Sequence, residues 1–360
     1  MEKNEIIVMY GSDAKEMAKE ILRAANIELL IGGRDKKIGL KPNLVVAKPA
    51  SGGATTHPEI LAGTIEYLQN RGFTSIAIIE GSWVGDRTKQ AFKICGYDKL
   101  AEKYGVELID TQQDGWHTYD CAGMKMDLCD SGMAVDFMIN IPVIKGHCQT
   151  GMTCALKNCK GLITNAEKRR FHTQGLHRPI AHLNTVAKTD FILVDGICGD
   201  LDFEEGGNPV PMNRMLGVQD RVLCDAYVAE LMGFEVDEVP YIRMAEKLGV
   251  GSADTSQAKV TELNRPVNDT GTVSGRKVKQ LERYAAPKDA CSACYGSLIH
   301  ALGRMSELGE LDALKHRVCI GQGYKNETGE LGVGSCTRNF TRSLPGCPPR
   351  AKDIIEFLRR

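Results

Sequence analysis

Apolar runs of strand length alternate with amphipathic stretches of helix length through the first two thirds of this chain. This alternation constrains the fold most, because a strand that is followed by a helix usually pairs with a parallel neighbour in the same sheet. We therefore predict an α/β fold with a largely parallel sheet and flanking helices. The expected strands are residues 6–9, 38–40, 75–80, 106–109, 135–141 and 191–194. The expected helices are residues 13–30, 58–70, 88–94, 178–188, 221–232 and 239–248.

The chain has 360 residues, more than one hydrophobic core usually supports, so a second unit is expected. The alternating pattern is lost between residues 251 and 287, where polar residues, glycine and threonine gather. We predict an α/β domain over residues 1–285, which could contain two subdomains, and a small iron-sulfur module over residues 286–360. Within the module, the sequence predicts a strand at 318–320 and helices at 295–308 and 350–359.

The iron-sulfur assignment depends on four cysteines, arranged as CSAC, GSC and GCPP: Cys291, Cys294, Cys336 and Cys347. A [4Fe-4S] cluster needs four thiolates that converge from different directions. A C-x-x-C loop together with two cysteines on glycine-flanked turns can supply them. Four-thiolate zinc sites usually join two C-x-x-C pairs, a spacing that the second pair here lacks. We therefore expect one [4Fe-4S] cluster, with a structural zinc ion as the alternative.

The net charge and the number of cysteines indicate which partners and which cellular compartment to expect. The formal net charge of −1 gives no support for nucleic-acid binding. Thirteen cysteines, an odd number, suit a metal-binding protein of a reducing cytoplasm better than a disulfide framework. The start, MEKNEIIVMYG, lacks the pattern of a signal peptide, and no apolar run reaches the roughly 18 residues that span a bilayer. We expect a cytoplasmic protein without membrane insertion; the sequence does not specify its oligomeric state.

Cationic and amide side chains follow the predicted strand at residues 38–40. Lys41, Asn43 and Lys48 lie in the segment KPNLVVAK. Ligands of open α/β sheets bind beyond the carboxyl ends of the strands, so these side chains are candidates for binding the phosphate or carboxylate group of a small anion. Solvated lysines and an asparagine that caps a turn would explain the same residues.

A denser cluster follows the predicted strand at residues 135–141. Lys145 and His147 leave the strand end together, and Lys157, Asn158 and Lys160 come shortly after. Lys157 and Lys160 are three residues apart and so share one side of a helix. Gathered cations repel one another unless an anion or acidic residues compensate for them. The cluster therefore favours an anion-binding pocket, with Lys145 and His147 as catalytic candidates.

Three further residues are catalytic candidates. His172 and His177 share a segment with His182, but their five-residue spacing does not form a helical metal site. We expect either His172 or His177 to donate a proton or bind substrate in the pocket, and His182 to be a packed core residue. Asp195 follows the strand at 191–194, where a carboxylate can accept a proton or orient a lysine.

A second group of cysteines, Cys148, Cys154 and Cys159, lies close to the cationic cluster. Their spacings match no metal-binding motif that we can defend. Small buried thiols explain them better, and we do not expect a second metal centre.

The chain resembles the family catalogued as domain of unknown function 362. The resemblance rests on several segments: KPNLV, the THPE segment with Thr56 and His57, IIEGS, INIPVIKGH, ALKNCKGLI, VDGI and the helix start that contains Asp220 and Asp225. The tail is similar to the iron-sulfur extension of some members. Cys291, Cys294, Cys336 and Cys347 match its ligand pattern, and Cys319 does not. The resemblance implies an iron-sulfur protein but specifies no reaction.

Two classes of function fit these residues. The first is a redox enzyme whose cluster passes single electrons to a small anionic substrate in the pocket, with a redox partner protein exchanging electrons with the cluster. The second is a non-enzymatic electron carrier or maturation factor, and a structural cluster beside a non-redox site is a further alternative. We favour the enzyme, because a carrier needs little beyond its cluster module whereas a large domain with a polar pocket precedes this one.

Overall fold

An eight-stranded sheet forms the centre of the computed structural model, which describes residues 1–266 and 280–360. Its strands pair in parallel except where β11 meets its two neighbours. The predicted α/β fold with a largely parallel sheet is confirmed. In spatial order the strands are β12 (Lys259–Glu262), β1 (Glu5–Tyr10), β11 (Pro209–Val218), β10 (Phe191–Asp200), β7 (Phe137–Asn140), β2 (Ile38–Lys41), β3 (Ile76–Glu80) and β4 (Glu107–Asp110).

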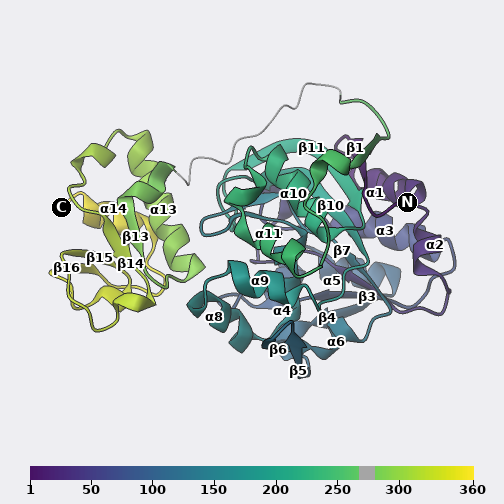
Figure 1. The fold of residues 1–360 in the computed structure, drawn as a ribbon, viewed down its shortest axis with the longest axis horizontal. Coiled ribbons are helices and arrows are strands. Elements are labelled where there is room, and N and C mark those ends of the chain that lie inside the picture. The colour runs from purple at the N-terminus through teal and green to yellow at the C-terminus, as the bar shows by residue number, and fades with distance from the viewer. Residues whose placement is uncertain (267–279) are drawn as a thin grey trace.

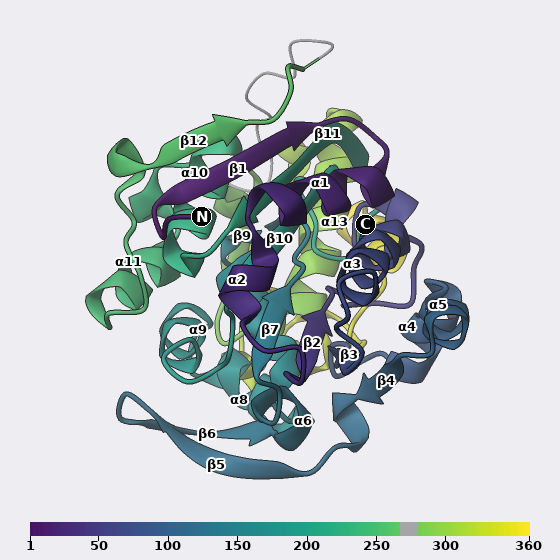
Figure 2. The ribbon, with the colours of Figure 1, turned by 90° about the vertical axis from the view of Figure 1, so that its right-hand side faces the viewer.

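Helices cover both faces of the sheet (Figures 1 and 2). Alternate residues of one strand serve the two cores: Ile7 packs in one of them, and Ile6 and Val8 in the other. The core that contains Ile7 lies under α1 (Ala14–Ala24), α2 (Ile27–Ile31), α3 (Pro58–Gln69), α4 (Thr88–Ile94) and α5 (Tyr97–Tyr104). The opposite core lies under α7 (Ala155–Asn158), α8 (Asn165–Thr173), α9 (His177–Leu183), α10 (Arg221–Leu231) and α11 (Pro240–Lys247).

Some elements differ from the sequence predictions. The helix expected at residues 13–30 is divided at Asn26, whose φ of 51° is left-handed and cannot continue a helix. The antiparallel strand β11 was not predicted, because its two prolines and its arginine hide the apolar alternation. Two short hairpins were also missed, β5 (Trp116–Cys121) with β6 (Met124–Cys129) and β8 (Lys145–His147) with β9 (Gly151–Thr153), as was α6 (Asp130–Met133).

The C-terminal residues form a second, smaller sheet with its own apolar core beside the large one (Figure 1). Its elements are β13 (Ala285–Pro287), α13 (Ser292–Glu307), β14 (Val318–Ile320), β15 (Leu331–Val333), β16 (Arg342–Leu344) and α14 (Ala351–Leu358). Two residues of the larger part, Cys148 and Phe203, are buried in this core. The polar segment expected between residues 251 and 287 contains β12, and its residues 267–279 lie outside the described ones. In the part of the chain that the structure describes, no helix is long and apolar enough to cross a membrane.

Candidate anion pocket and cysteine site

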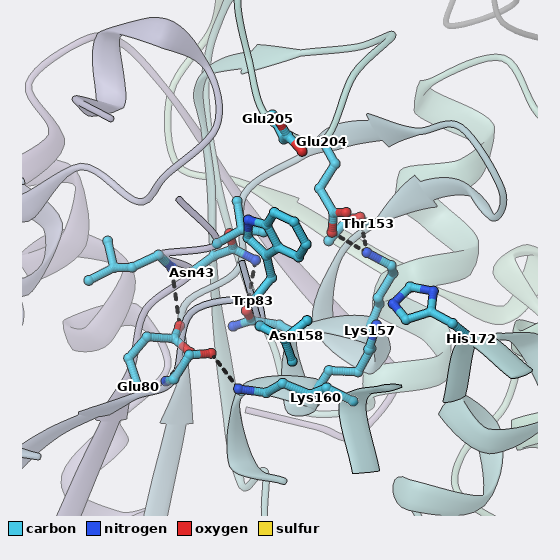
Figure 3. A pocket seen from close by; sticks show the side chains of 16 residues that line it. Asn43, Glu80, Trp83, Thr153, Lys157, Asn158, Lys160, His172, Glu204 and Glu205 are labelled. Atoms are coloured by element: carbon cyan, nitrogen blue, oxygen red, sulfur yellow. Dashed lines mark hydrogen bonds and ion pairs between the residues drawn. The ribbon is translucent and has the colours of Figure 1, made fainter. Parts of the chain in front are cut away.

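A pocket opens at the carboxyl ends of the parallel strands, the edge at which ligands of such sheets bind. Its walls come from the segments that follow β2 and β3, from α7 and α8, and from the loop between β10 and β11 (Figure 3). Its space amounts to about 70 Å³, well below the roughly 300–1,000 Å³ of sites for drug-sized ligands. As it stands, the pocket admits only a small group.

A fully buried ion pair lies at the edge of the pocket. Lys41 ends β2 and Glu80 ends β3, and Lys41 Nζ lies 2.8 Å from Glu80 Oε2 with the two side chains 1% and 3% exposed. Glu80 also accepts hydrogen bonds from the backbone N–H groups of Leu44 and Gly81 at 3.1 and 2.6 Å. A buried charge is tolerated only when it is paired and hydrogen-bonded, so this arrangement fixes the two strand ends relative to each other.

Two asparagines extend this network toward Lys145. Asn43 Nδ2 donates to Asn158 Oδ1 at 2.9 Å, and Lys145 Nζ donates to Asn43 Oδ1 at 2.9 Å. Lys145 Nζ also donates to the carbonyls of Ala54 and Glu204 at 2.7 and 3.1 Å. Burial lowers the pKa of Lys145 to about 7, but three acceptors occupy its ammonium protons. Lys145 therefore ties the walls together and does not face the pocket with a free donor.

His147, Lys157 and Glu204 form the second charged group. Glu204 Oε1 accepts a hydrogen bond from Lys157 Nζ, and Glu204 Oε2 lies 3.0 Å from His147 Nε2. Burial and the charge of Lys157 lower the pKa of His147 to about 4, so its ring is neutral. His147 Nδ1 accepts backbone N–H groups of Gln149 and Thr150 at 3.1 Å each, which leaves the ring proton on Nε2. Figure 3 shows Glu204 extending to Lys157, next to His172.

Two more lysines line the pocket. The pKa of Lys160 is lowered to about 7, mainly by burial and to a smaller extent by the charge of Lys157. Among the described residues no carboxylate lies within ion-pair distance of Lys160, and its Nζ lies 5.9 Å from the centre of the Phe171 ring. Burial also lowers the pKa of Lys168 to about 8, and its Nζ donates to the carbonyls of Gly81 and Ser82. Lys160 is thus the pocket lysine best placed to receive an anion.

His172 lines the pocket, while the other histidine candidate lies elsewhere. Burial and the charge of Lys160 lower the pKa of His172 to about 3, so it is neutral. His177 does not line the pocket; its ring stacks at 5.9 Å on Tyr241, and burial lowers its pKa. Of the two, His172 is the one positioned for contact with a ligand.

Asp195 and Lys48 also lie apart from the pocket lining. Asp195 accepts from the backbone N–H of His57 and lies 2.8 Å from His57 Nδ1. Burial opposes protonation of His57, but the bond to Asp195 outweighs it, and the pKa of His57 is raised. Lys48 is exposed, and its Nζ donates to the carbonyl of Glu205 at 2.9 Å. The pocket thus brings together Asn43, Lys157, Asn158, Lys160 and His172, with Lys41, Lys145 and His147 behind its walls.

Four charged pocket residues were absent from the predicted set: Glu80, Lys168, Glu204 and Glu205. Glu80 ends a predicted buried strand, where an acidic residue is a usable signal. Lys168 lies on α8, which the alternation did not reveal, and Glu204 lies in a loop without regular structure. Their roles depend on segments that meet only in the folded chain.

The four module cysteines approach one another. Cys291 and Cys294 share a hydrogen bond that lowers the pKa of Cys291 to about 6 and raises that of Cys294. Gln322 Nε2 donates to Cys291 Sγ at 3.3 Å. Cys294 lies near enough to interact electrostatically with Cys336 and Cys347 as well. Cys319 instead contacts the hydroxyl group of Tyr324. The sulfurs of Cys291, Cys294, Cys336 and Cys347 are therefore the local donor set.

A third group of thiols lies outside the pocket. Cys154 Sγ and Cys224 Sγ are 4.0 Å apart, and together with Asp225 they could hold a metal ion among the described residues. Asp225, however, accepts the backbone N–H groups of Ala155 and Leu156 and so caps α7. Burial raises the pKa values of both thiols, as expected for packed cysteines.

Comparison with known sequences gives one family. The family described as Domain of unknown function (DUF362) matches residues 38–230, which contain all the residues that line the pocket. The thylakoid-associated protein sll1697 of Synechocystis sp. is 23% identical over 228 residues, 59% of this chain and 68% of that protein. The matched family segment ends before the module cysteines.

Solved structures give more distant matches. The lactate racemase apoprotein of Thermoanaerobacterium thermosaccharolyticum has a TM-score of 0.43 at 11% identity, over 64% of this chain and 58% of that one. A protein from Thermotoga maritima has a TM-score of 0.36 at 14% identity, over 71% of this chain and 62% of that one. The chain spans less than two thirds of either structure, and neither match is close enough to carry an argument about activity.

Proposed function

The chain belongs to the DUF362 family, and we propose that it is an iron-sulfur protein that acts as a redox enzyme on a small anionic substrate. In this proposal residues 286–360 are a module in which Cys291, Cys294, Cys336 and Cys347 hold one [4Fe-4S] cluster. The pocket at the sheet edge binds the substrate. When bound, the cluster would supply or accept single electrons.

The geometry of the sulfurs supports a cluster more than a single zinc ion. Thiolates around one zinc ion lie about 3.8 Å apart, from Zn–S bonds of about 2.3 Å in a tetrahedron. No three of these four sulfurs lie within 4.8 Å of one another in the described chain. In a cubane each sulfur binds a different iron atom, so a wider set of donors is expected. The lowered pKa of Cys291 supplies thiolate character at neutral pH.

Contact between the module and the pocket walls is the observation that carries the enzyme proposal. Gln149 Nε2 donates to the carbonyl of Ala290 at 2.7 Å, one residue before Cys291. The backbone N–H of Gln149 in turn donates to His147 Nδ1. A chain of bonded groups therefore leads from a cluster ligand to a pocket wall. An electron carrier would need no such connection to an anion pocket.

The pocket residues have separate tasks in this proposal. Lys160 and Lys157 bind the anion, and His147 Nε2 lies 3.0 Å from the carboxylate that Lys157 holds. Lys145 and Asn43 keep the walls in place, and the neutral ring of His172 lines the space in which the ligand binds. A partner protein that exchanges electrons with the cluster completes the proposal.

Metal and sulfide analysis of anaerobically purified protein tests the cluster. We expect about four iron atoms and four acid-labile sulfides per chain, with charge-transfer absorbance in the visible range. Stoichiometric zinc without sulfide would reject the cluster and with it the redox role. Titration with sulfate tests the pocket separately, since sulfate binding that is lost in Lys160→Met would support an anion site whatever metal the cysteines hold.

A further inference from the structure

Glu204 occupies the most strongly cationic part of the pocket. One carboxylate oxygen is bound by Lys157 Nζ, and the other lies 3.0 Å from His147 Nε2. Neither side chain has another carboxylate within ion-pair distance among the described residues. Lys157 thus binds one oxygen, and His147 Nε2, which has no hydrogen-bond partner of suitable geometry in the described chain, lies beside the other, so the two groups mark a site for a carboxylate.

Glu204 reaches this site from a loop, so its side chain can rotate away without moving a strand. The segment lies between Asp200, which ends β10, and Pro209, which begins β11, and contains no helix or strand. Its side chain is 20% exposed, so it forms part of the pocket surface. By contrast Glu80, an acid on the opposite wall of the pocket, ends a central strand and is 3% exposed. Of the two acids, Glu204 is the one that can leave without breaking the sheet.

The size of the pocket favours such a movement. About 70 Å³ of space remains while Glu204 is in place, and Glu204 already contacts both Lys157 and His147. A ligand bound only to Lys160 would leave these two donors unused. Release of Glu204 would give the ligand both donors and enlarge the pocket.

We propose that Glu204 holds the place of the ligand's own carboxylate: the substrate is a small carboxylate that bridges Lys157 and His147 and displaces Glu204 on binding. This assignment rests on the proposed function, whose anion pocket it narrows to one class of substrate. Carboxylate replaces carboxylate, so the charge of the site is preserved in both states.

Displacement of Glu204 would also affect the contact between its loop and the module. Phe203, next to Glu204, is buried in the module core, and its ring stacks on His300 with centroids 3.5 Å apart. Movement of the segment strains or breaks this stack, so ligand binding and module contact oppose each other. Replacing Phe203 by a smaller residue then removes part of the resistance to displacement.

The test compares acetate and sulfate binding to wild-type protein and to Glu204→Gln by calorimetry at pH 6.5. The neutral amide keeps the shape of the side chain but no longer competes for the cations, so acetate affinity should rise about tenfold or more, equivalent to about 1.4 kcal/mol. Sulfate can also bridge two donors, but it is tetrahedral and larger than the planar carboxylate group that leaves, so it should gain less. Glu102→Gln, an exposed change on α5 with the same loss of charge, should leave both affinities unchanged.

The outcomes separate this inference from the proposed function. If Glu204→Gln binds sulfate as the wild type does and acetate no more tightly, Glu204 is not a stand-in, although the anion pocket survives. An equal gain for acetate and sulfate would reject the carboxylate class. If neither anion binds any variant, both the inference and the pocket fail. Phe203→Leu gives an independent check and should raise acetate affinity in the same direction, by a smaller factor.

Discussion

The pocket and the cysteine site differ in how their charged groups are compensated. At the pocket, two buried lysines have opposite partners from distant segments: Lys41 meets Glu80, and Lys157 meets Glu204. In the cysteine site, four groups of one kind face one another, and they are half-buried or exposed except for Cys294. The paired charges of the pocket are balanced by protein groups, whereas the gathered cysteines are the groups that the proposed cluster would hold together.

This difference predicts that substitutions at the two sites affect different properties of the protein. Removing one member of a compensated pair should damage folding, because the remaining charge stays buried. Removing one cysteine should damage metal binding first and the folding of the large sheet hardly at all. The following changes test that contrast, beginning with the largest expected effect.

Replacing Cys336 by serine should abolish the cluster. Loss of one thiolate leaves one iron without its ligand, and the visible absorbance and acid-labile sulfide of the anaerobically purified protein should disappear. The thermal unfolding of the large sheet should change little. If the variant retains full absorbance and sulfide, Cys336 is not a ligand and the predicted donor set is wrong.

Replacing Glu80 by alanine should reduce the free energy of unfolding by about 3–5 kcal/mol. The change leaves the ammonium group of Lys41 buried without a counter-charge. Urea denaturation measures the loss. Glu107→Gln is the matched control, because it breaks an exposed pair with Lys37 and should cost less than about 1 kcal/mol. Equal costs for the two variants would show that water reaches the Lys41–Glu80 pair.

Sulfate affinity should fall roughly tenfold as the pH rises from 6 to 8. The pKa of Lys160 is lowered to about 7, so its ammonium form binds the anion below pH 7 and is lost above it. Sulfate keeps its charge over this range, and calorimetry at several pH values measures the effect. Lys160→Arg keeps its charge at every pH tested and should flatten the profile. A wild-type profile that stays flat would exclude Lys160 as the binding cation.

Replacing Cys319 by serine should have the smallest effect. This thiol contacts Tyr324 and lies outside the predicted donor set, so iron content and visible absorbance should stay close to those of the wild type. The same spectra used for the Cys336 variant provide the measurement. If this variant loses the absorbance and Cys336→Ser keeps it, Cys319 is a cluster ligand and Cys336 is not.

Much of the fold could be predicted because its signals are local. Apolar runs placed β3 and β14, and Pro58 and the polar residues before it placed α3 within a residue of its ends. The hairpins and β11 were missed because their alternation is short or broken by proline and charge. The division at Asn26 was missed because a single left-handed residue leaves the apolar pattern intact.

The sequence by itself determined which residues stand at the strand ends: Lys41 follows one apolar run and Asn140 lies near the end of another, and parallel pairing brings such ends to one edge. Only the tertiary structure decided which charges meet. Coulomb energy depends on distance and burial, and Lys157 and Glu204 are 47 residues apart in the chain yet in contact in the fold. It likewise placed Asp195 with His57 instead of in the pocket, and set Phe203 in the core of the module.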